Sequence, residues 1–212
     1  TMLAGKKAAA DTSLSKNEMV DFVVNLHFAC MEIRDKIESL EKEKTELVSK
    51  LMVIEPFRTL DLDLKKALDF KFMRARFGRV KSEHFHKFEK YMYNNLNALF
   101  IEASRTSDYV YGGYIVANGE ASKADSAFKS LHFEKIDLGN LVDGTPGAAY
   151  AALAKQLANL NGKIDMLKAE EAGLLNKNAA KIIASKERLE ELSASFDVRK
   201  LAARVEAEEE DY

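Results

Sequence analysis

Histidine and cysteine, the side chains that most often bind metals or act as nucleophiles near neutral pH, are scarce in this chain. It has four histidines and one cysteine. His84 and His86 form the only suggestive pair, but two residues apart on a helix they point to nearly opposite sides, unlike the i, i+4 histidines of helical zinc sites. His27 and His132 are expected to be packing or surface residues. We therefore expect no metal site and no bound cofactor.

The glycine and serine contexts also lack the features of an active site. Gly112 and Gly113 lie inside a strand pattern, and residues 142–147 lack the lysine and the following serine or threonine of a phosphate-binding loop. No serine stands in a nucleophile elbow, and Cys30 falls among apolar helix positions, where a thiolate is disfavoured. The sequence therefore indicates a protein that is not an enzyme.

A group of basic residues in one predicted strand is a better candidate for function. Its members are Lys71, Arg74, Arg76 and Arg79. One interpretation is a solvated edge strand whose cations protect it against aggregation. The other is a docking surface for an acidic partner, since arginine pairs bidentately with carboxylates. Nucleic acid is the weaker option for a partner, because Phe72 and Phe77 suit base stacking but the rest of the chain is not basic.

Composition narrows the class of protein further. The 212 residues include 32 basic and 34 acidic side chains, so the net charge gives no bulk attraction to nucleic acid. The single cysteine cannot form an internal disulfide. The longest apolar stretches, such as residues 148–154, are far shorter than the roughly 20 residues of a membrane-spanning helix. We expect a water-soluble chain without a secretory signal and, because it starts at Thr1, part of a longer protein.

A long helix is predicted near the start of the chain, over residues 15–55. Ser15 and Glu18 have the form of a capping box, which marks a helix start. Apolar residues then follow alternating steps of four and three, the spacing of a coiled-coil seam, with charged residues between them. The seam positions are Leu26, Cys30, Ile33, Ile37, Leu40, Lys44, Leu47, Leu51 and Ile54. Lys44 is the only polar member.

A second long helix is predicted over residues 146–209, with Thr145 as its cap and Pro146 in its first turn. Its seam begins with Leu153, Leu157, Leu160, Ile164 and Leu167. Beyond Gly173 it resumes one residue out of phase at Leu175, Ile182, Leu189, Leu192 and Phe196. Because such a shift locally unwinds a supercoil, we expect an irregular or bent region near Gly173.

The segment between the helices, residues 56–145, has the pattern of a small α/β lobe. Strands are predicted over 70–80, 98–103, 109–117 and 133–138, and helices over 82–93 and 121–131. This β-α-β-β-α-β order is typical of a ferredoxin-like lobe with two helices on one face of the sheet. The apolar alternation of the first strand is imperfect, which indicates either a bulge there or an error in its predicted register. The expected fold class is α+β, an antiparallel two-helix coiled coil capped by this lobe.

Several motifs in the central segment occur in the order of a known family. They are Glu55-Pro56-Phe57, Leu60-Asp61-Leu62-Asp63-Leu64, Arg76-Phe77-Gly78-Arg79, Tyr109-Val110-Tyr111-Gly112-Gly113-Tyr114, Ser130-Leu131-His132-Phe133-Glu134 and Gly144-Thr145-Pro146. Together they resemble the cytoplasmic arm of subunit I of bacterial and archaeal V/A-type rotary ATPases, the counterpart of eukaryotic subunit a. The resemblance covers roughly Ile54 to Pro146, and the flanking helices match in type more than in residues.

The resemblance implies a non-catalytic stator arm. In that family the arm has a proximal lobe, a two-helix coiled coil and a distal lobe, and a membrane domain with half-channels for H⁺ or Na⁺ follows. This sequence resembles the coiled coil and distal lobe only, so the family's ion-path residues have no counterpart here. The implied partners are the E/G heterodimers of the peripheral stalks and other ATPase subunits. The implied location is the cytoplasmic side of a membrane-bound complex, without insertion of this chain into the bilayer.

Two other classes of function remain as alternatives. A coiled-coil spacer or tether with a hinge-like lobe, unrelated to ATPases, predicts dimerisation through the lobe or affinity for DNA. A small enzyme built on the lobe would need a convergent pair of catalytic groups, and the fold alone implies no activity. Under the ATPase hypothesis, the basic residues of the first strand are assigned to the stalk contact.

Overall fold

The computed structural model describes residues 15–139, 141 and 144–209. These residues form two compact units, which we describe separately. The helical unit contains the described residues up to Leu40 and those from Lys163 onward, and the sheet unit is Glu41–Gly162. The long helices are α1 (Lys16–Ile54), α5 (Pro146–Lys177) and α6 (Ala179–Glu209), and both α1 and α5 contribute to each unit.

The first helix begins as the capping box predicts. The Ser15 amide donates to the Glu18 carboxylate at 2.8 Å, and the Glu18 amide donates to the Ser15 hydroxyl at 3.4 Å. These bonds lower the pKa of Glu18, because they favour its charged form. Two otherwise unpaired groups at the helix start are thereby satisfied.

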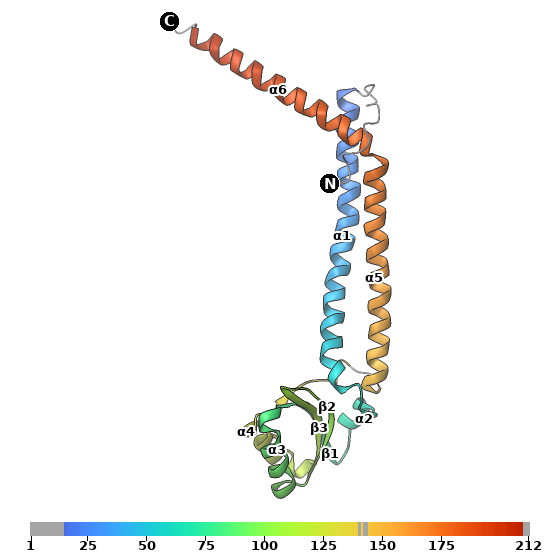
Figure 1. The fold of residues 1–212 in the computed structure, drawn as a ribbon, viewed down its shortest axis with the longest axis vertical. Coiled ribbons are helices and arrows are strands. Elements are labelled where there is room, and N and C mark those ends of the chain that lie inside the picture. The colour runs from blue at the N-terminus through green and yellow to red at the C-terminus, as the bar shows by residue number, and fades with distance from the viewer. Residues whose placement is uncertain (1–14, 140, 142–143, 210–212) are drawn as a thin grey trace. The chain divides into compact units, whose positions relative to one another are not determined.

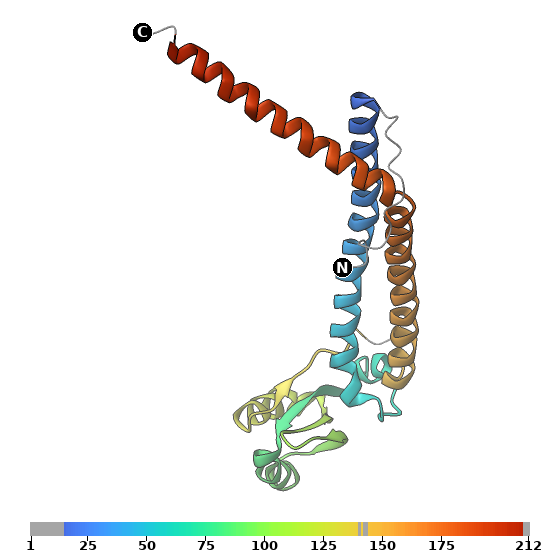
Figure 2. The same ribbon diagram turned by 45° about the horizontal axis from the view of Figure 1, so that its top comes forward.

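The predicted seam of α1 is the side of the helix that is covered. Cys30, Ile33, Leu47, Leu51 and Ile54 are buried, and the remaining seam positions, Lys44 among them, are half-buried. Within each unit α1 and α5 lie side by side (Figures 1 and 2). In the helical unit Arg34 donates to Glu171 at 2.5 Å. Over the described part of the chain, no helix has both the length and the apolar character needed to cross a membrane.

The expected second helix is divided by a turn, which lies at Asn178 and not near Gly173. Gly173 stays inside α5. The Asn178 side chain donates to the Leu174 carbonyl at 2.8 Å, so it competes with the backbone for a helical acceptor. Beyond the turn, α6 packs on α1 within the helical unit, where the Lys181 ammonium lies 5.7 Å from the centre of the Phe22 ring.

The sheet unit contains four strands in the expected order. The strands are β1 (Met73–Lys81), β2 (Ala98–Arg105), β3 (Tyr109–Ala117) and β4 (Glu134–Lys135), with α3 (Ser82–Asn95) after β1 and α4 (Ala121–Ser130) after β3. The short elements η1 (Glu55–Phe57), α2 (Leu64–Leu68) and η2 (Asn118–Glu120) complete the unit. The strands lie in the order β2-β3-β1-β4, and every neighbouring pair is antiparallel. The fold is therefore α+β, with paired long helices and a four-stranded antiparallel sheet.

The boundaries of β1 and β4 differ from the predicted ones. β1 starts at Met73, so Phe70 and Phe72 lie outside it, and β4 has two residues in place of 133–138. The expected irregularity in β1 is absent; the register shift lies in β2, between Glu102 and Ser104. Phe70 and Phe72, which broke the apolar alternation, precede the strand, so the predicted extent of the strand was wrong.

Each face of the sheet has its own core. The first core lies under α3 and α4 and consists of Val80, Phe85, Phe88, Met92, Leu96, Val110, Tyr114, Val116, Ala121, Ala124 and Phe128. The second core covers the other face with the end of α1, the segment after it and the start of α5 (Figure 1). Its buried members are Ile54, Phe57, Leu60, Leu64, Ala67, Ala75, Phe77 and Leu138.

Phe57 is the centre of this second core. It has no exposed surface, and its ring meets Phe77 of β1 and Tyr111 of β3 edge-on, with ring centres 6.4 Å and 6.0 Å away. Edge-on aromatic pairs contribute about 0.5–1.5 kcal/mol each beyond the burial of area. The Thr59 hydroxyl donates to the Ala103 carbonyl, and the Leu64 amide to the Gly144 carbonyl. The connection from α1 is thus tied to the sheet by both apolar and polar contacts.

The first core contains one buried polar group with a partner on α4. Tyr114 is 3% exposed, and its hydroxyl donates to Asp125 at 2.5 Å. Burial raises the pKa of Tyr114 above the ordinary value of 10.0, and the bond to the Asp125 carboxylate raises it further. The folded state therefore holds this phenol neutral at a pH where an unfolded chain would ionise it.

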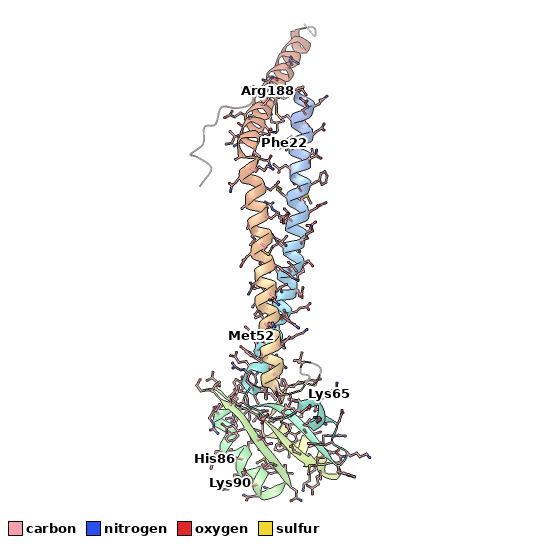
Figure 3. All side chains as sticks on the ribbon, turned by 90° about the vertical axis from the view of Figure 1, so that its right-hand side faces the viewer. Phe22, Met52, Lys65, His86, Lys90 and Arg188 are labelled. Carbon is pink, nitrogen blue, oxygen red and sulfur yellow. The ribbon has the colours of Figure 1, made fainter. Side chains whose placement is uncertain are left out.

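Replacing Phe57 by alanine should destabilise the sheet unit by about 3–5 kcal/mol, because the change opens a cavity between helix ends and sheet. Denaturant unfolding followed by circular dichroism would measure the loss. Met52→Ala is the matched control, since Met52 on α1 is 68% exposed (Figure 3) and should change stability little. A loss below about 1 kcal/mol for Phe57→Ala would contradict the central place given to this ring.

The stability contributed by neutral Tyr114 is fully present below pH 10 and should fall as the pH rises above that value. Denaturant unfolding at pH 8 and near pH 11 would measure the fall in the parent chain. Tyr114→Phe should lose less stability than the parent over this interval. The difference between the two losses should be about 1 kcal/mol for each pH unit above 10. Tyr93→Phe, at a 64% exposed position, should behave as the parent. Equal losses in parent and Tyr114→Phe would refute the account of this core.

Candidate interaction surfaces

The residues considered for chemistry do not converge in the structure. His84 stacks on His132 with ring centres 4.9 Å apart, whereas His86 is exposed. Cys30 is buried on the seam of α1. Among the residues that the structure describes, no group of three or more His, Cys, Asp or Glu side chains is placed to hold a metal ion. The surfaces of the molecule are therefore the better candidates for function.

Two of the four basic residues singled out in the sequence are engaged within the sheet unit. Arg76 points to the α4 side, 3.5 Å from Asp125, the same carboxylate that binds the Tyr114 hydroxyl. Arg79 lies on the other face of β1, donates to Glu134 at 2.7 Å and covers the Tyr109 ring at 4.1 Å. The bond to Glu134 raises the pKa of Arg79, with a smaller contribution from Tyr111, so Arg79 keeps its charge.

The other two basic residues, Lys71 and Arg74, are exposed. Lys71 precedes β1, and its carbonyl accepts a bond from the Asn118 side chain at 2.9 Å. Beside them stand Phe70, Phe72 and Met73, which are 41%, 80% and 51% exposed. The sequence places the four basic residues together, but strand alternation separates Arg79 from Arg74 and Arg76. What remains open to a partner is a mixed basic and apolar surface at the start of β1.

β1 is an outer strand over only part of its length, since no described strand pairs with Met73 to Arg76 on the side away from β3. β3 flanks it along its whole length, and β4 pairs with it at Gly78 and Arg79. The outer strand on the opposite side of the sheet is β2, which pairs with β3 alone among the described strands. The first four residues of β2, Ala98 to Ile101, carry no charge, although exposed outer strands are usually protected by charged residues or proline.

A small apolar pocket adjoins β2. Its volume is about 180 Å³, and it is lined by Leu60, Asp61, Leu62, Phe77, Ile101, Gly113 and Ile115. The Phe77 ring lies over Gly113, 2.7 Å from where a Cβ would stand, and so closes the pocket on that side. Leu99, on the same face of β2 as Ile101, is 56% exposed. The unbroken apolar run in β2 was the available sequence signal for this surface, which our sequence analysis did not identify.

Within the helical unit, α1 carries an exposed apolar stripe in addition to its covered seam. Val20, Val24, Phe28 and Met31 are between 42% and 60% exposed. Their spacing of four, four and three puts them on one side of the helix, away from the seam. This stripe was missed in the sequence because the seam already accounted for the apolar pattern.

Comparison with known proteins finds similarity in structure. No protein-family model matches the chain, and no curated protein matches its sequence. Among solved structures, the chain is similar to one described as the crystal structure of the cytoplasmic N-terminal domain of subunit I, homolog of subunit a, of V-ATPase. The identity is 16% and the TM-score 0.45, over 74% of this chain and 55% of that one. The chain thus spans about half of that structure.

Proposed function

We propose that this chain is part of the stator arm of a V/A-type rotary ATPase. In this role it links the membrane ion-translocating part to the peripheral stalks on the cytoplasmic side, and it supports ATP-coupled transport of H⁺ or Na⁺ without catalysing any step. Residues 15–55 and 146–209, the second range divided by the turn at Asn178, supply the helices of a coiled coil. Residues 56–145 are its ferredoxin-like distal lobe.

The observation that supports the proposal is that the motifs shared with the ATPase family contact one another in the folded chain. Phe57 of the first motif contacts Phe77 and Tyr111 of two others. The Leu64 amide bonds to the Gly144 carbonyl, and Arg79 to Glu134. Motifs spread over the central segment are therefore neighbours in one junction between helix ends and sheet. A chance resemblance of scattered motifs would not require such contacts.

The helices suit a load-bearing role on physical grounds. A stator must hold still against the torque between the catalytic head and the rotating ring. Each helix carries backbone hydrogen bonds along its axis, and a covered apolar seam resists separation of the pair. The ion pair between Arg34 and Glu171 joins α1 and α5 in the helical unit, although an exposed pair of this kind adds little stability.

The contact with the E/G heterodimer is assigned to the basic strand residues and their surroundings. Lys71 and Arg74 are the exposed members and are available to acidic side chains of a partner. Arg76 and Arg79 contribute by holding β1 against α4 and β4. A contact of exposed charges should weaken with salt, since the screening length falls from about 10 Å at 0.1 M to about 3 Å at 1 M.

The alternative function is a coiled-coil spacer or tether unrelated to ATPases. The exposed apolar stripe of α1 is compatible with this alternative, because a tether needs a surface that binds a second protein. Affinity for DNA and no affinity for E/G heterodimer would support the tether in place of the stator arm.

Calorimetric titration with purified E/G heterodimer at two salt concentrations tests the proposal. We expect saturable binding that weakens with salt. The double variant Lys71→Glu/Arg74→Glu should bind at least about tenfold more weakly, because two attractive contacts become repulsive.

The matched control is Lys87→Glu/Lys90→Glu, which reverses two exposed charges on α3, where Figure 3 labels Lys90. It should bind as the parent does. Binding that ignores salt and survives reversal of Lys71 and Arg74 would overturn the charge contact. No binding by a folded chain at high micromolar concentration would remove the support for the stator arm.

A further inference from the structure

The outer edge of β2 has the properties of a site for strand addition. In strand addition, an extended peptide pairs with an exposed sheet edge, and pockets beside the edge select its side chains. β2 pairs on one side with β3, and among the described strands none pairs with its other side. Backbone groups along that side can therefore bond to an added strand.

The usual protections of an edge strand are weak here. Ala98, Leu99, Phe100 and Ile101 carry no charge, and the one acidic residue of the strand, Glu102, is held by two bonds from Arg105. The register shift after Glu102 and the bond from Thr59 to the Ala103 carbonyl limit the regular edge to its first half. An added strand would thus pair with Ala98–Glu102.

The pocket lies where an added strand could fill it. Phe77, Gly113 and Ile101 are successive residues across β1, β3 and β2 on one face of the sheet. The next position in this row belongs to the added strand, about 4.8 Å beyond Ile101. A side chain there can lean over Ile101 into the pocket, which Ile115 and Leu60 also line. The volume of about 180 Å³ is similar to that of an engineered apolar cavity of about 150 Å³ that accepts benzene.

The charge of Asp61 at the pocket indicates which type of residue should neighbour the apolar side chain in the partner's sequence. Asp61 lines the pocket and is exposed, while the other lining residues are apolar or glycine. A basic residue of the partner could keep its ammonium or guanidinium beside Asp61 and lay its aliphatic stem on Leu62. Lys71 and Arg74, by contrast, lie at the end of the sheet where β2 begins. Both strands start opposite the end of β3, because Met73 of β1 pairs with Ala117 and Ala98 of β2 pairs with Val116.

We propose that the edge of β2 binds an extended segment of the peripheral-stalk partner, with one apolar side chain in the pocket beside Ile101 and a neighbouring basic side chain beside Asp61. This inference rests on the proposed function. It adds a backbone contact and an apolar anchor to the charge contact at Lys71 and Arg74.

The test is hydrogen exchange of the whole chain, followed by mass spectrometry, with and without purified E/G heterodimer. Strand addition should slow exchange by at least about tenfold at those backbone amides of Ala98–Glu102 that point away from β3. Leu99→Lys places a charge on the edge at an exposed position, so it should fold normally, bind at least about tenfold more weakly and lose this protection. Tyr93→Lys, on exposed α3 surface, is the matched control and should match the parent.

The outcomes separate the two proposals. Binding without protection of β2, and with Leu99→Lys equal to the parent, would overturn strand addition and leave the stator arm standing. Protection of β2 that appears without E/G and rises with protein concentration would also overturn it, since a second copy of this chain would then occupy the edge. Absence of binding would overturn both proposals.

Discussion

The packing of Phe57 between Phe77 and Tyr111 is the contact on which the sheet unit depends. α3 and α4 cover one face of the sheet, so the opposite face needs another cover. The chain supplies it from the end of α1, where Ile54 is fully buried, through η1 and α2, and from the first turns of α5. Because these segments are far apart in sequence, the second core forms only when both helix ends and the sheet are in place.

This arrangement bears on how a stator arm would work. If the helices carried load into a mobile loop, the lobe could turn without resisting it. Instead α1 runs directly into η1, whose Phe57 is enclosed by the sheet, and Ala149, Tyr150 and Leu153 of α5 pack on the same core. Close-packed apolar contacts of this kind transmit strain with little deformation. Load on the helix pair would therefore reach the sheet through packed side chains.

Much of this architecture was predictable from local patterns. The capping box at Ser15, the seam of α1, the order of the strands and the full extent of β3, 109–117, all follow from periodicity and turn signals. Two errors have physical causes. The predicted first strand is too long because Phe70 and Phe72 are apolar but exposed. The bend was expected at Gly173, whereas the turn lies at Asn178, whose side chain bonds to the Leu174 carbonyl.

The candidate surfaces were less accessible to sequence reasoning. A cluster of four basic residues was visible, but their partners were not, because Asp125 and Glu134 are distant in sequence from Arg76 and Arg79. The pocket beside β2 depends on three strands and the segment from Leu60 to Leu62 meeting around Gly113. Contacts of this range are set by the tertiary fold, so no window of sequence contains them.

Cross-linking mass spectrometry of the chain with E/G heterodimer tests the central claim most directly, because it reports which surface the partner meets. The stator account predicts cross-links from the sheet unit, at Lys71 first, which is exposed before β1. Cross-links confined to lysines of the helical unit, such as Lys186 on α6, would contradict it and show that the sheet unit is not where the partner binds.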